Sequence, residues 1–507
     1  MMRAGLLLLT LLGAPQIDFE LRYLGVHGRR QHTLAWDFSG DGRGDLLNCS
    51  IDYDKNPPER WLALHVQKDD GYGESPDALW AVDDRACALI FGDFVPGGGT
   101  EAGFLAEDGV YVYPWVDGRP SERPTKLLHG ATFFRTPPAQ QLPLWQWKMD
   151  FDGDGRDDLL VPLPDGYRAY FQTAPGVFGR VATLEGDLPA QAAHALSASG
   201  SAEKPETLPV HFHASLELPK VEWSDINGDG LSDLVLIRRD TVTYFIQKDR
   251  GVFPSTRPWR VSFRVPTLAT ETKKDTVDVA MVRFVDINRD GLADLVVTRV
   301  GGQLGLWDSI KTSIYLHLGT GKGNFIADKR IVIDGVSIDP EFIDMNLDGK
   351  LDVVTSRLRT DLMQQAIKAF VLGDITITYE VFQFDAQKNM FLADPVYAQD
   401  VLVARRDLEK TGAGAVPLLF IRGDLSGDGR PDVVVVQPGT LELAIHPGVV
   451  RETGAGARIG FDGTAHWRVK IDRYPKGLHI LDVNSDGVND VMLYYAGALG
   501  LVLSKKR

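Results

Sequence analysis

The sequence predicts an all-β protein: a single β-propeller of eight four-stranded antiparallel blades, with one short inserted helix. Three observations predict this fold. An acidic nine-residue loop recurs seven times and once more in a damaged form, and apolar, β-branched runs follow the intact copies. The copies start at residues 37, 93, 150, 225, 286, 344, 424 and 482, about 58 residues apart with two longer intervals, which is the period of a repeat architecture. Seven blades is the alternative count.

The intact loops span residues 37–45, 150–158, 225–233, 286–294, 344–352, 424–432 and 482–490. Each has Asp at positions 1, 5 and 9, a short oxygen-bearing side chain at position 3 and Gly at position 6. Position 7 varies, as expected if only its main-chain carbonyl is used. Ca²⁺ takes six to eight such oxygen ligands, and a sharp turn at position 6 favours Gly. The pattern therefore predicts about seven structural Ca²⁺ ions.

The predicted metal ligands, with position 7 acting through its carbonyl, are Asp37, Ser39, Asp41, Arg43, Asp45, Asp150, Asp152, Asp154, Arg156, Asp158, Asp225, Asn227, Asp229, Leu231, Asp233, Asp286, Asn288, Asp290, Leu292, Asp294, Asp344, Asn346, Asp348, Lys350, Asp352, Asp424, Ser426, Asp428, Arg430, Asp432, Asp482, Asn484, Asp486, Val488 and Asp490.

Two other interpretations of these loops are weaker. An EF-hand needs Glu at position 12 and flanking helices, whereas position 12 is not acidic in any copy and strand-forming residues follow position 9. Solvated Asp-Gly turns explain one copy but not seven in register. The formal net charge of −15 agrees with metal sites, because seven Ca²⁺ would neutralise about 14 of those charges. Without a basic stripe, the composition argues against nucleic-acid binding.

Each repeat has the same expected order of elements. A strand such as 282–285 leads into the loop, a second strand leaves it, and the third strand is aromatic, as at 244–246. A turn with Gly-x-Phe, as at 251–253, then opens a fourth strand. The damaged loop at 93–101 lacks oxygen side chains at positions 3 and 5, so we expect no calcium in its blade.

The chain ends predict how the ring closes. After the last loop only two strands follow, at 491–495 and 499–503, so the last blade is one strand short. The strand-like segment 17–23 precedes the first blade and belongs to none. We expect it to complete the last blade and hide both sheet edges, which makes residues 16–507 one domain.

The loops, the segment Phe91-Gly92-Asp93-Phe94 and the four-strand period resemble the FG-GAP/VCBS repeat family, best known from the seven-bladed integrin α head. The resemblance covers roughly residues 30–495. It implies a calcium-bearing propeller, usually extracellular, that often serves in adhesion or carbohydrate binding. Eight repeats depart from the integrin count, so integrin ligand specificity does not carry over.

The N-terminus predicts export. Residues 1–15 combine a positive start with the short apolar run 6–12, as in a secretory signal peptide, and the run is too short to span a bilayer. No other segment reaches membrane-spanning length. Cys49 and Cys87 are the only cysteines, and the sequence leaves a disulfide and two buried free thiols open.

Long insertions are expected mostly on the rim opposite the acidic loops, where a partner protein or glycan would bind. They are residues 52–60, 129–142, 187–216, 301–311, 357–374 and 405–416, and an apolar stripe over 358–371 predicts the inserted helix. The candidate partner contacts are Tyr53, Phe133, Phe134, Arg135 and Trp307. The alternative for each is packing of its insertion onto a blade.

The sequence favours binding over catalysis. It contains no His-Glu-x-x-His, Gly-x-Ser-x-Gly or Cys-x-x-Cys motif. We therefore expect a secreted, calcium-stabilised scaffold for protein binding or adhesion, without enzymatic activity. A lectin-like carbohydrate-binding propeller is the main alternative, since stacking on exposed aromatics needs no motif. A polysaccharide lyase with a Lys, His or Tyr base facing the axis is the enzymatic one.

Overall fold

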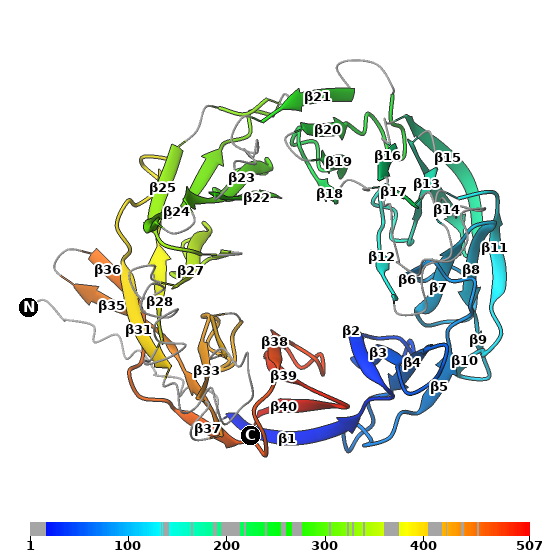
Figure 1. Ribbon diagram of the computed structural model, residues 1–507, viewed down its shortest axis with the longest axis horizontal. Helices are drawn as coiled ribbons and strands as arrows, with labels where there is room; N and C mark the ends of the chain where they lie inside the picture. The colour runs from blue at the N-terminus through cyan, green and yellow to red at the C-terminus, as the bar shows by residue number, and fades with distance from the viewer. Residues whose placement is uncertain are drawn as a thin grey trace, which may run out of the picture.

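The computed structural model shows a closed ring of small antiparallel sheets around a central axis (Figure 1). It describes residues 17–506 except 133, 135–140, 164–165, 186–189, 194–212, 217–219, 239–240, 255–259, 266–275, 304–305, 322–323, 327–328, 338–339, 359–374, 404–417, 422, 438–440 and 454–455. All regular elements in this described part are strands.

The sheets form eight blades, so the alternative of seven is wrong. From the axis outward, blade 1 contains β2 (Arg29–Trp36), β3 (Asp45–Asp52), β4 (Glu59–His65) and β5 (Ala78–Ala81), blade 2 contains β6 (Ala88–Gly92), β7 (Glu101–Ala106), β8 (Gly109–Tyr113) and β11 (Thr125–His129), and blade 3 contains β12 (Leu144–Trp147), β13 (Leu159–Leu163), β14 (Gly166–Ala174) and β15 (Val177–Glu185). Blade 4 contains β18 (Lys220–Ser224), β19 (Asp233–Arg238), β20 (Thr241–Phe245) and β21 (Arg260–Arg264), blade 5 contains β22 (Thr276–Val285), β23 (Asp294–Gln303), β24 (Leu306–His317) and β25 (Lys329–Asp334), and blade 6 contains β26 (Glu341–Ile343), β27 (Asp352–Leu358), β28 (Ile375–Phe382) and β31 (Tyr397–Val403). Blade 7 contains β32 (Leu418–Ile421), β33 (Val433–Gln437), β34 (Glu442–His446) and β37 (Trp467–Lys470), and blade 8 contains β38 (Gly477–Leu481), β39 (Asp490–Tyr495), β40 (Ala498–Lys506) and β1 (Ile17–Gly25).

Short hairpins extend four of the connections. They are β9 (Trp115–Val116) with β10 (Arg119–Pro120), β16 (Ala190–Ala193) with β17 (His213–Leu216), β29 (Phe384–Asp385) with β30 (Met390–Phe391), and β35 (Gly448–Thr453) with β36 (Gly456–Phe461).

The ring closes through β1, which pairs antiparallel with β40 from Ile17↔Lys506 to Gly25↔Ala498. Figure 1 shows this first strand lying beside the last one. The indole N–H of Trp467 donates to the Ile17 carbonyl at 2.8 Å, and Phe19 packs edge-on against the same indole. Residues from the two ends of the chain therefore share one sheet, in the position expected for segment 17–23.

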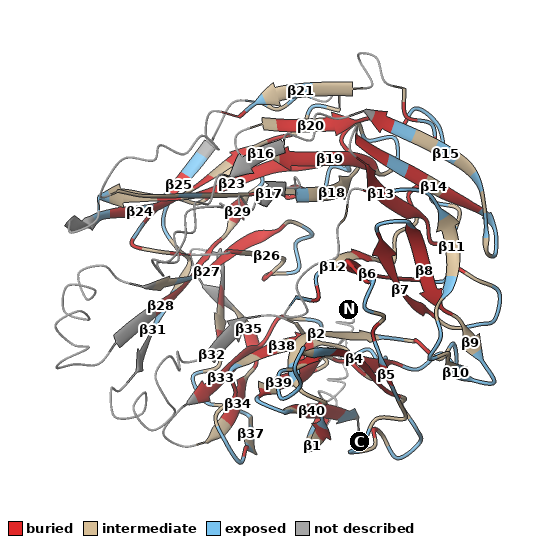
Figure 2. Ribbon diagram, turned by 45° about the vertical axis from the view of Figure 1, so that its right-hand side comes forward, coloured by how far each residue is buried: buried red, intermediate tan, exposed pale blue. Residues whose placement is uncertain are grey.

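The core consists of eight clusters, one at each junction between neighbouring blades. Successive residues of a strand point to opposite faces of its sheet. On β19, Leu234 packs toward blade 3 and Val235 toward blade 5. Both faces of a second strand are thus buried (Figure 2), which explains why these strands are apolar runs without alternation.

The Gly-x-Phe turns supply part of this packing. Phe253 lies at the junction of blades 3 and 4, near Trp223, and Phe325 lies at the next junction between Phe263 and Phe284. Phe253 and Phe325 thus each lie in the connection between the third and fourth strands of a blade, and each packs against the preceding blade. These connections are themselves long, for example 246–259 and 447–466, so long connections occur on both rims.

Blade 3 departs from the regular pattern. Its inner strand β12 pairs in parallel with β6 of blade 2, and β13 lacks an inner neighbour in its own sheet. The Gln146 carboxamide makes two of the hydrogen bonds that an inner strand would otherwise make with β13. Its nitrogen donates to the Asp158 carbonyl at 2.5 Å, and its oxygen accepts from the Leu160 amide at 3.0 Å. A buried side chain therefore replaces a pair of main-chain hydrogen bonds.

Three further predictions have different outcomes. Segment 301–311 is not an insertion, because β23 and β24 extend through it to a tight hairpin. The helix expected over 358–371 falls almost wholly outside the described residues. Cys49 and Cys87 are both buried thiols, and no disulfide joins them. In the described part of the chain, no helix has the length and hydropathy of a membrane span.

Candidate metal-binding loops

Each acidic loop joins the first strand of a blade to its second, and all seven fold in the same way. The position 1 carboxylate accepts the amides of positions 5 and 6, and the position 5 carboxylate accepts the amide of position 7. In loop 225–233, Asp225 binds the Asp229 amide at 3.2 Å and the Gly230 amide at 2.7 Å. The same bonds recur in the other six loops.

Two positions of each loop have left-handed backbone. Position 6 is Gly with φ between +82° and +87°, as the sequence predicts. Position 4 was not predicted. It is Gly in four loops, but Arg289, Leu347 and Ser485 adopt φ of +54°, +60° and +59° in the others. The recurrence of Gly at position 4 is the sequence signal for this second turn residue.

The position 9 carboxylate anchors the loop to the sheet. In loop 225–233 it is Asp233, whose Oδ2 accepts the Ile226 amide at 2.9 Å and whose Oδ1 accepts the Gln247 amide, at the end of the third strand, at 2.8 Å. All seven position 9 residues are fully buried. Burial raises the pKa of Asp158, Asp233, Asp352 and Asp490 to about 7 and that of Asp294 and Asp432 to about 6. Desolvation is the largest cause of each increase, and hydrogen bonds from main-chain amides offset it only in part.

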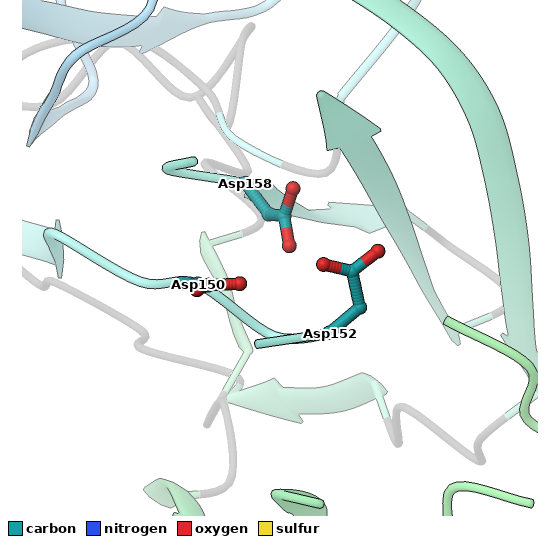
Figure 3. Close-up of side chains that lie close together, drawn as sticks. All are labelled: Asp150, Asp152 and Asp158. Atoms are coloured by element: carbon teal, nitrogen blue, oxygen red, sulfur yellow. The ribbon is translucent and has the colours of Figure 1, made fainter. Parts of the chain in front are cut away.

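Loop 150–158 concentrates the most charge. Oxygens of Asp150, Asp152 and Asp158 all lie within 4.8 Å of one another, and Figure 3 shows the three side chains converging. Asp152 is 3 % exposed; its Oδ2 pairs with Arg180, while its buried Oδ1 has no hydrogen-bond partner among the residues that the structure describes. Carboxylates with spare lone pairs around one point are the donor set that a hard divalent cation requires. The residues of this loop therefore fit Ca²⁺.

In four other loops the position 3 residue is Asn, and its amide nitrogen lies 2.8–3.2 Å from the position 5 carboxylate. The carboxamide oxygen of the same Asn faces the position 5 amide at 3.0–3.1 Å. These loops therefore offer the carboxylate and carboxamide oxygens of the predicted ligand set, with fewer carboxylates than loop 150–158.

The damaged loop keeps the anchor and loses the ligands. Glu101 replaces the position 9 Asp, and its Oε2 accepts the amides of Phe94 and Val95 at 2.7 and 3.3 Å. Its Oε1 is buried without a hydrogen-bond partner in the described part of the chain, and burial raises the pKa of Glu101 to about 7. The loop has no side-chain oxygen at positions 3 and 5, so its residues do not fit a calcium site.

The comparisons with known proteins agree with this geometry. Residues 225–297 and 286–355, which contain consecutive loops and the strands around them, match the FG-GAP-like repeat. The chain is a β-propeller with FG-GAP-like repeats over residues 225–355.

No curated protein matches the sequence of this FG-GAP propeller. Among solved structures it is similar to an Agrocybe aegerita lectin that recognises non-reducing terminal N-acetylglucosamine, at 13 % identity over 92 % of this chain and 96 % of that one, with a TM-score of 0.41. It is also similar to BBS1N in complex with ARL6DN, at 8 % identity over 95 % and 94 %, with a TM-score of 0.35. Hsv2 from Kluyveromyces lactis matches at 10 % identity over 86 % and 98 %, with a TM-score of 0.31.

Neighbouring loops of the propeller are hydrogen-bonded to one another, which the sequence did not predict. In the described part of the chain these bonds cross seven of the eight junctions. The amides of Thr100, Ala293, Leu351 and Asn489 donate to the carbonyls of Phe38, Asp225, Ile287 and Asp424 of the preceding loops, and the side chains of Gln172, Gln247 and Tyr72 reach the carbonyls of Asp93, Phe151 and Val483.

The two glutamines had a weak sequence signal. Gln172 and Gln247 each lie 14 residues after the last Asp of their loops. The loop rim, meaning the end of the ring that carries the acidic loops, is thus a belt of turns that hydrogen bonds link from blade to blade.

The candidate partner contacts have different positions. Tyr53, on the rim opposite the loops, is 43 % exposed, and the Arg29 guanidinium lies 6.0 Å from its ring centre. Phe134 packs edge-on against Trp145 at 5.5 Å, so it contributes to packing and is not an exposed contact. Trp307 belongs to β24, but the structure does not describe its side chain. Phe133 and Arg135 lie outside the described residues.

Proposed function

We propose that this FG-GAP propeller is a secreted, calcium-stabilised scaffold that binds a protein partner through the rim opposite the acidic loops and catalyses no reaction. One observation carries the proposal. The long connections β11–β12, β15–β18, β27–β28 and β31–β32 start and end at that rim, whereas on the loop rim hydrogen bonds join the turns of neighbouring blades. Connections on a rigid scaffold are the usual location of binding residues.

Calcium has a structural role in this proposal. The fully buried position 9 carboxylates and the buried Asp152 Oδ1, which accepts no hydrogen bond from the described residues, support it, because a divalent cation would balance the charge of these carboxylates and coordinate that oxygen. With a Kd of about 10⁻⁴ M and millimolar Ca²⁺, each filled site adds on the order of 1–2 kcal/mol to the free energy of unfolding. Ca²⁺ would neutralise the loop carboxylates and hold the turns that link neighbouring blades.

Elemental analysis and thermal unfolding test this role. We expect about seven calcium ions per chain, and a lower Tm after chelation that added calcium restores. Asp229→Ala should remove one ion. Asp93→Ala, an equally exposed aspartate of the damaged loop, is the matched control and should remove none. The absence of bound calcium at millimolar supply, or an equal loss from both variants, contradicts the proposal.

Site-specific photo-crosslinking tests the partner-binding rim. A photoreactive phenylalanine analogue replaces Tyr53 on the opposite rim or Val252, which is 44 % exposed on the loop rim. In the native extracellular medium or cell envelope, we expect one partner protein to be linked from position 53 and not from position 252. Cross-links from position 252 alone, or from neither, would overturn the proposed rim.

Export and the absence of catalysis have their own tests. N-terminal sequencing of the exported protein should show that residues 1–15 have been removed; an uncleaved, retained protein contradicts secretion. Turnover of anionic polysaccharides by the purified protein would replace the scaffold with the lyase alternative.

A further inference from the structure

The junction at which the ring closes, between blade 8 and blade 1, changes from apolar to polar toward the rim opposite the acidic loops. Figure 1 shows these two blades side by side. Near the loop rim, Leu46 of β3 packs with Met492 and Leu501 of blade 8. The next residues on the same face of β3 are Asn48 and Ser50. At the position of Asn48 the other six intact repeats have Val, Leu or Thr, so this polar strip is particular to blade 1.

Several hydrogen-bond donors of this strip are buried and unsatisfied in the described part of the chain. Asn48 and Ser50 are fully buried. The Asn48 Oδ1 accepts the Thr33 hydroxyl at 2.7 Å, whereas its Nδ2 has no hydrogen-bond partner. The Ser50 Oγ has none either, nor has the indole nitrogen of Trp61, which is the cross-strand neighbour of Ser50 on β4. A buried polar group without a partner costs free energy, so this set of donors needs an acceptor.

Arg30 adds a positive charge beside these donors. It lies opposite Ser50 in the pairing of β2 with β3, and its guanidinium carbon is 3.7 Å from the centre of the Tyr494 ring of blade 8. Among the described residues, which include all of 17–66 and 476–506, no carboxylate or other acceptor pairs with this guanidinium. Burial lowers the pKa of Arg30, as expected for a half-buried cation without a counter-charge.

The next acidic side chain on this face of β3, Asp52, interacts with other groups. Its Oδ1 accepts the Asp54 amide at 3.0 Å, and its Oδ2 lies 3.8 Å from the His27 Nε2. His27 in turn packs edge-on against Trp61, with 4.6 Å between the ring centres. The uncompensated charge of Arg30 is therefore a local feature of a chain whose formal net charge is −15.

Open space adjoins Tyr494 on its inner side. On β38, the innermost strand of blade 8, Gly477 is the cross-strand neighbour of Tyr494 and shares its face of the sheet. A Cβ at 477 would meet only the Tyr494 Cδ2, at 3.4 Å, and the φ of Gly477 is not left-handed. The backbone does not require glycine here, and the missing side chain leaves the pair of Tyr494 and Arg30 uncovered toward the axis.

The chemistry of these groups selects an anion. A guanidinium, an indole N–H and a carboxamide NH₂ are all donors, and the hydroxyl of Ser50 donates as well. A guanidinium that stacks on an aromatic ring keeps the N–H groups along its edge available, and their fork matches the two oxygens of a carboxylate. A metal cation would be repelled by Arg30, and a neutral ligand would leave its charge unbalanced.

We propose that the junction of blades 8 and 1 binds a carboxylate at its end opposite the acidic loops, and that an acidic side chain of the protein partner supplies it. The source of the carboxylate rests on the proposed partner-binding rim, whereas the site itself concerns this chain alone. Arg30 and Tyr494 belong to the first and last blades, so a bound carboxylate also bridges the two blades that close the ring.

Thermal unfolding of the full chain in saturating calcium, with acetate replacing chloride at constant ionic strength, tests the site. Acetate is the probe because, unlike phosphate, it leaves calcium in solution. We expect acetate to raise the Tm of the unmodified protein. Arg30→Met, which keeps an apolar side chain against Tyr494, should weaken the apparent affinity for acetate by about tenfold or more. Arg29→Met is the matched control, because it removes the same charge from the other face of β2, and it should keep the full rise.

Gly477→Val blocks the site without changing its charge and should also lose the effect of acetate. An equal rise in Tm for Arg30→Met and the unmodified protein, or no rise in any protein, would overturn the carboxylate site. Should Arg30→Met fail to fold, Ser50→Ala removes one buried donor and takes its place.

The source of the carboxylate is tested with the photoreactive group at position 53. Arg30→Met should reduce the yield of the cross-linked partner by about tenfold or more. An unchanged yield would show that the partner does not supply the carboxylate. The absence of a cross-linked partner in the unmodified protein contradicts the proposed rim but leaves the acetate result standing, so the two failures are distinguishable.

Discussion

At the scale of single residues, the acidic loops show how backbone conformation selects amino acids. Position 6 needs left-handed φ and is Gly in every copy, whereas position 4 needs it too but tolerates Leu347 at +60°. A non-glycine residue in the left-handed region costs roughly 1–2 kcal/mol. The interactions of the loop thus hold Leu347 and its counterparts in a strained backbone conformation. In the other copies, Gly adopts the same conformation without this strain.

Two substitutions in loop 344–352 measure this strain. Leu347→Gly removes it from a 51 % exposed position and should raise the free energy of unfolding by about 0.5–1 kcal/mol, after allowing for the flexibility of Gly in the unfolded chain. Gly349→Ala, with φ +82° and no atom within 4 Å of the new Cβ, should lower it by about 1 kcal/mol. Urea unfolding in saturating calcium gives both values; changes of the same sign would refute the explanation.

Glu101 makes stability depend on pH. Burial raises its pKa from 4.5 to about 7, so between these values the folded protein retains a proton that the unfolded chain has lost. The favourable contribution of this proton is present at low pH and is lost as the pH rises through 7. Above that pH, the buried charge costs about 3 kcal/mol relative to the neutral acid.

Glu101→Gln should abolish this dependence. We expect it to match the unmodified protein near pH 4.5 and to be more stable by up to about 3 kcal/mol at pH 8. The difference between the two proteins, measured by urea unfolding across this range, cancels contributions from the other loops. Glu59→Gln, at an exposed position of β4, is the control. Parallel stability curves for Glu101→Gln and the unmodified protein would contradict the assignment.

At the scale of elements, β12 is held by side chains where other inner strands use their main chain. Gln146 is 3 % exposed and satisfies both the Asp158 carbonyl and the Leu160 amide. Gln146→Met keeps the volume but leaves these buried groups unpaired, at roughly 1–3 kcal/mol each. We expect urea unfolding to show a loss of about 2–5 kcal/mol, and hydrogen exchange to show faster exchange of the Leu160 amide.

Gln31→Met on β2 is the control for this prediction. The Gln31 side chain hydrogen-bonds only at the surface, to the Arg29 carbonyl at 3.2 Å, so its loss should change stability by less than about 0.5 kcal/mol. A loss below 1 kcal/mol in Gln146→Met, with Leu160 still protected, would mean that the carboxamide does not replace the ladder.

The sequence predicted where the strands lie better than it predicted which strands pair with one another. The loops, the apolar second strands and the aromatic third strands follow from local chemistry and periodicity. The pairing of β12 with β6 does not, because a parallel contact between inner strands leaves no local pattern. Likewise segment 301–311 was expected to be an insertion, but pairing across β22, β23 and β24 makes it part of the sheet although Gly301 and Gly302 disfavour strands.

The candidate site was predicted to a similar extent. Loop positions 1, 3, 5, 6, 7 and 9 were interpreted from residue types, and the hydrogen bonds that the seven loops share agree with one common geometry; their binding of a metal stays a prediction. The links between loops were missed, because Gln172 and the amide of Ala293 act on the preceding blade. Phe134 was misjudged since exposure of an aromatic in a long connection depends on tertiary neighbours such as Trp145.

At the scale of the whole molecule, ring closure follows from the problem of sheet edges. A blade with three strands leaves an unpaired edge, and an open ring leaves one junction without its core. β1 solves both, because it completes the sheet of blade 8 and contributes Leu24 to the junction with blade 1 and Phe19, Leu21 and Tyr23 to the junction with blade 7.

Deletion of β1 should therefore destabilise the entire propeller and not only its last blade. Ile17 and Leu24 are fully buried, at about 1.5–3 kcal/mol each, and Phe19, Leu21 and Tyr23 are partly buried. Together with the lost hydrogen bonds, we expect removal of residues 1–25 to cost about 5–10 kcal/mol, which is comparable to the total stability of many domains. Calorimetry should show a much lower Tm, against a control that lacks only residues 1–16. An unchanged Tm, or loss of blade 8 alone by hydrogen exchange, would show that the other blades hold together without closure.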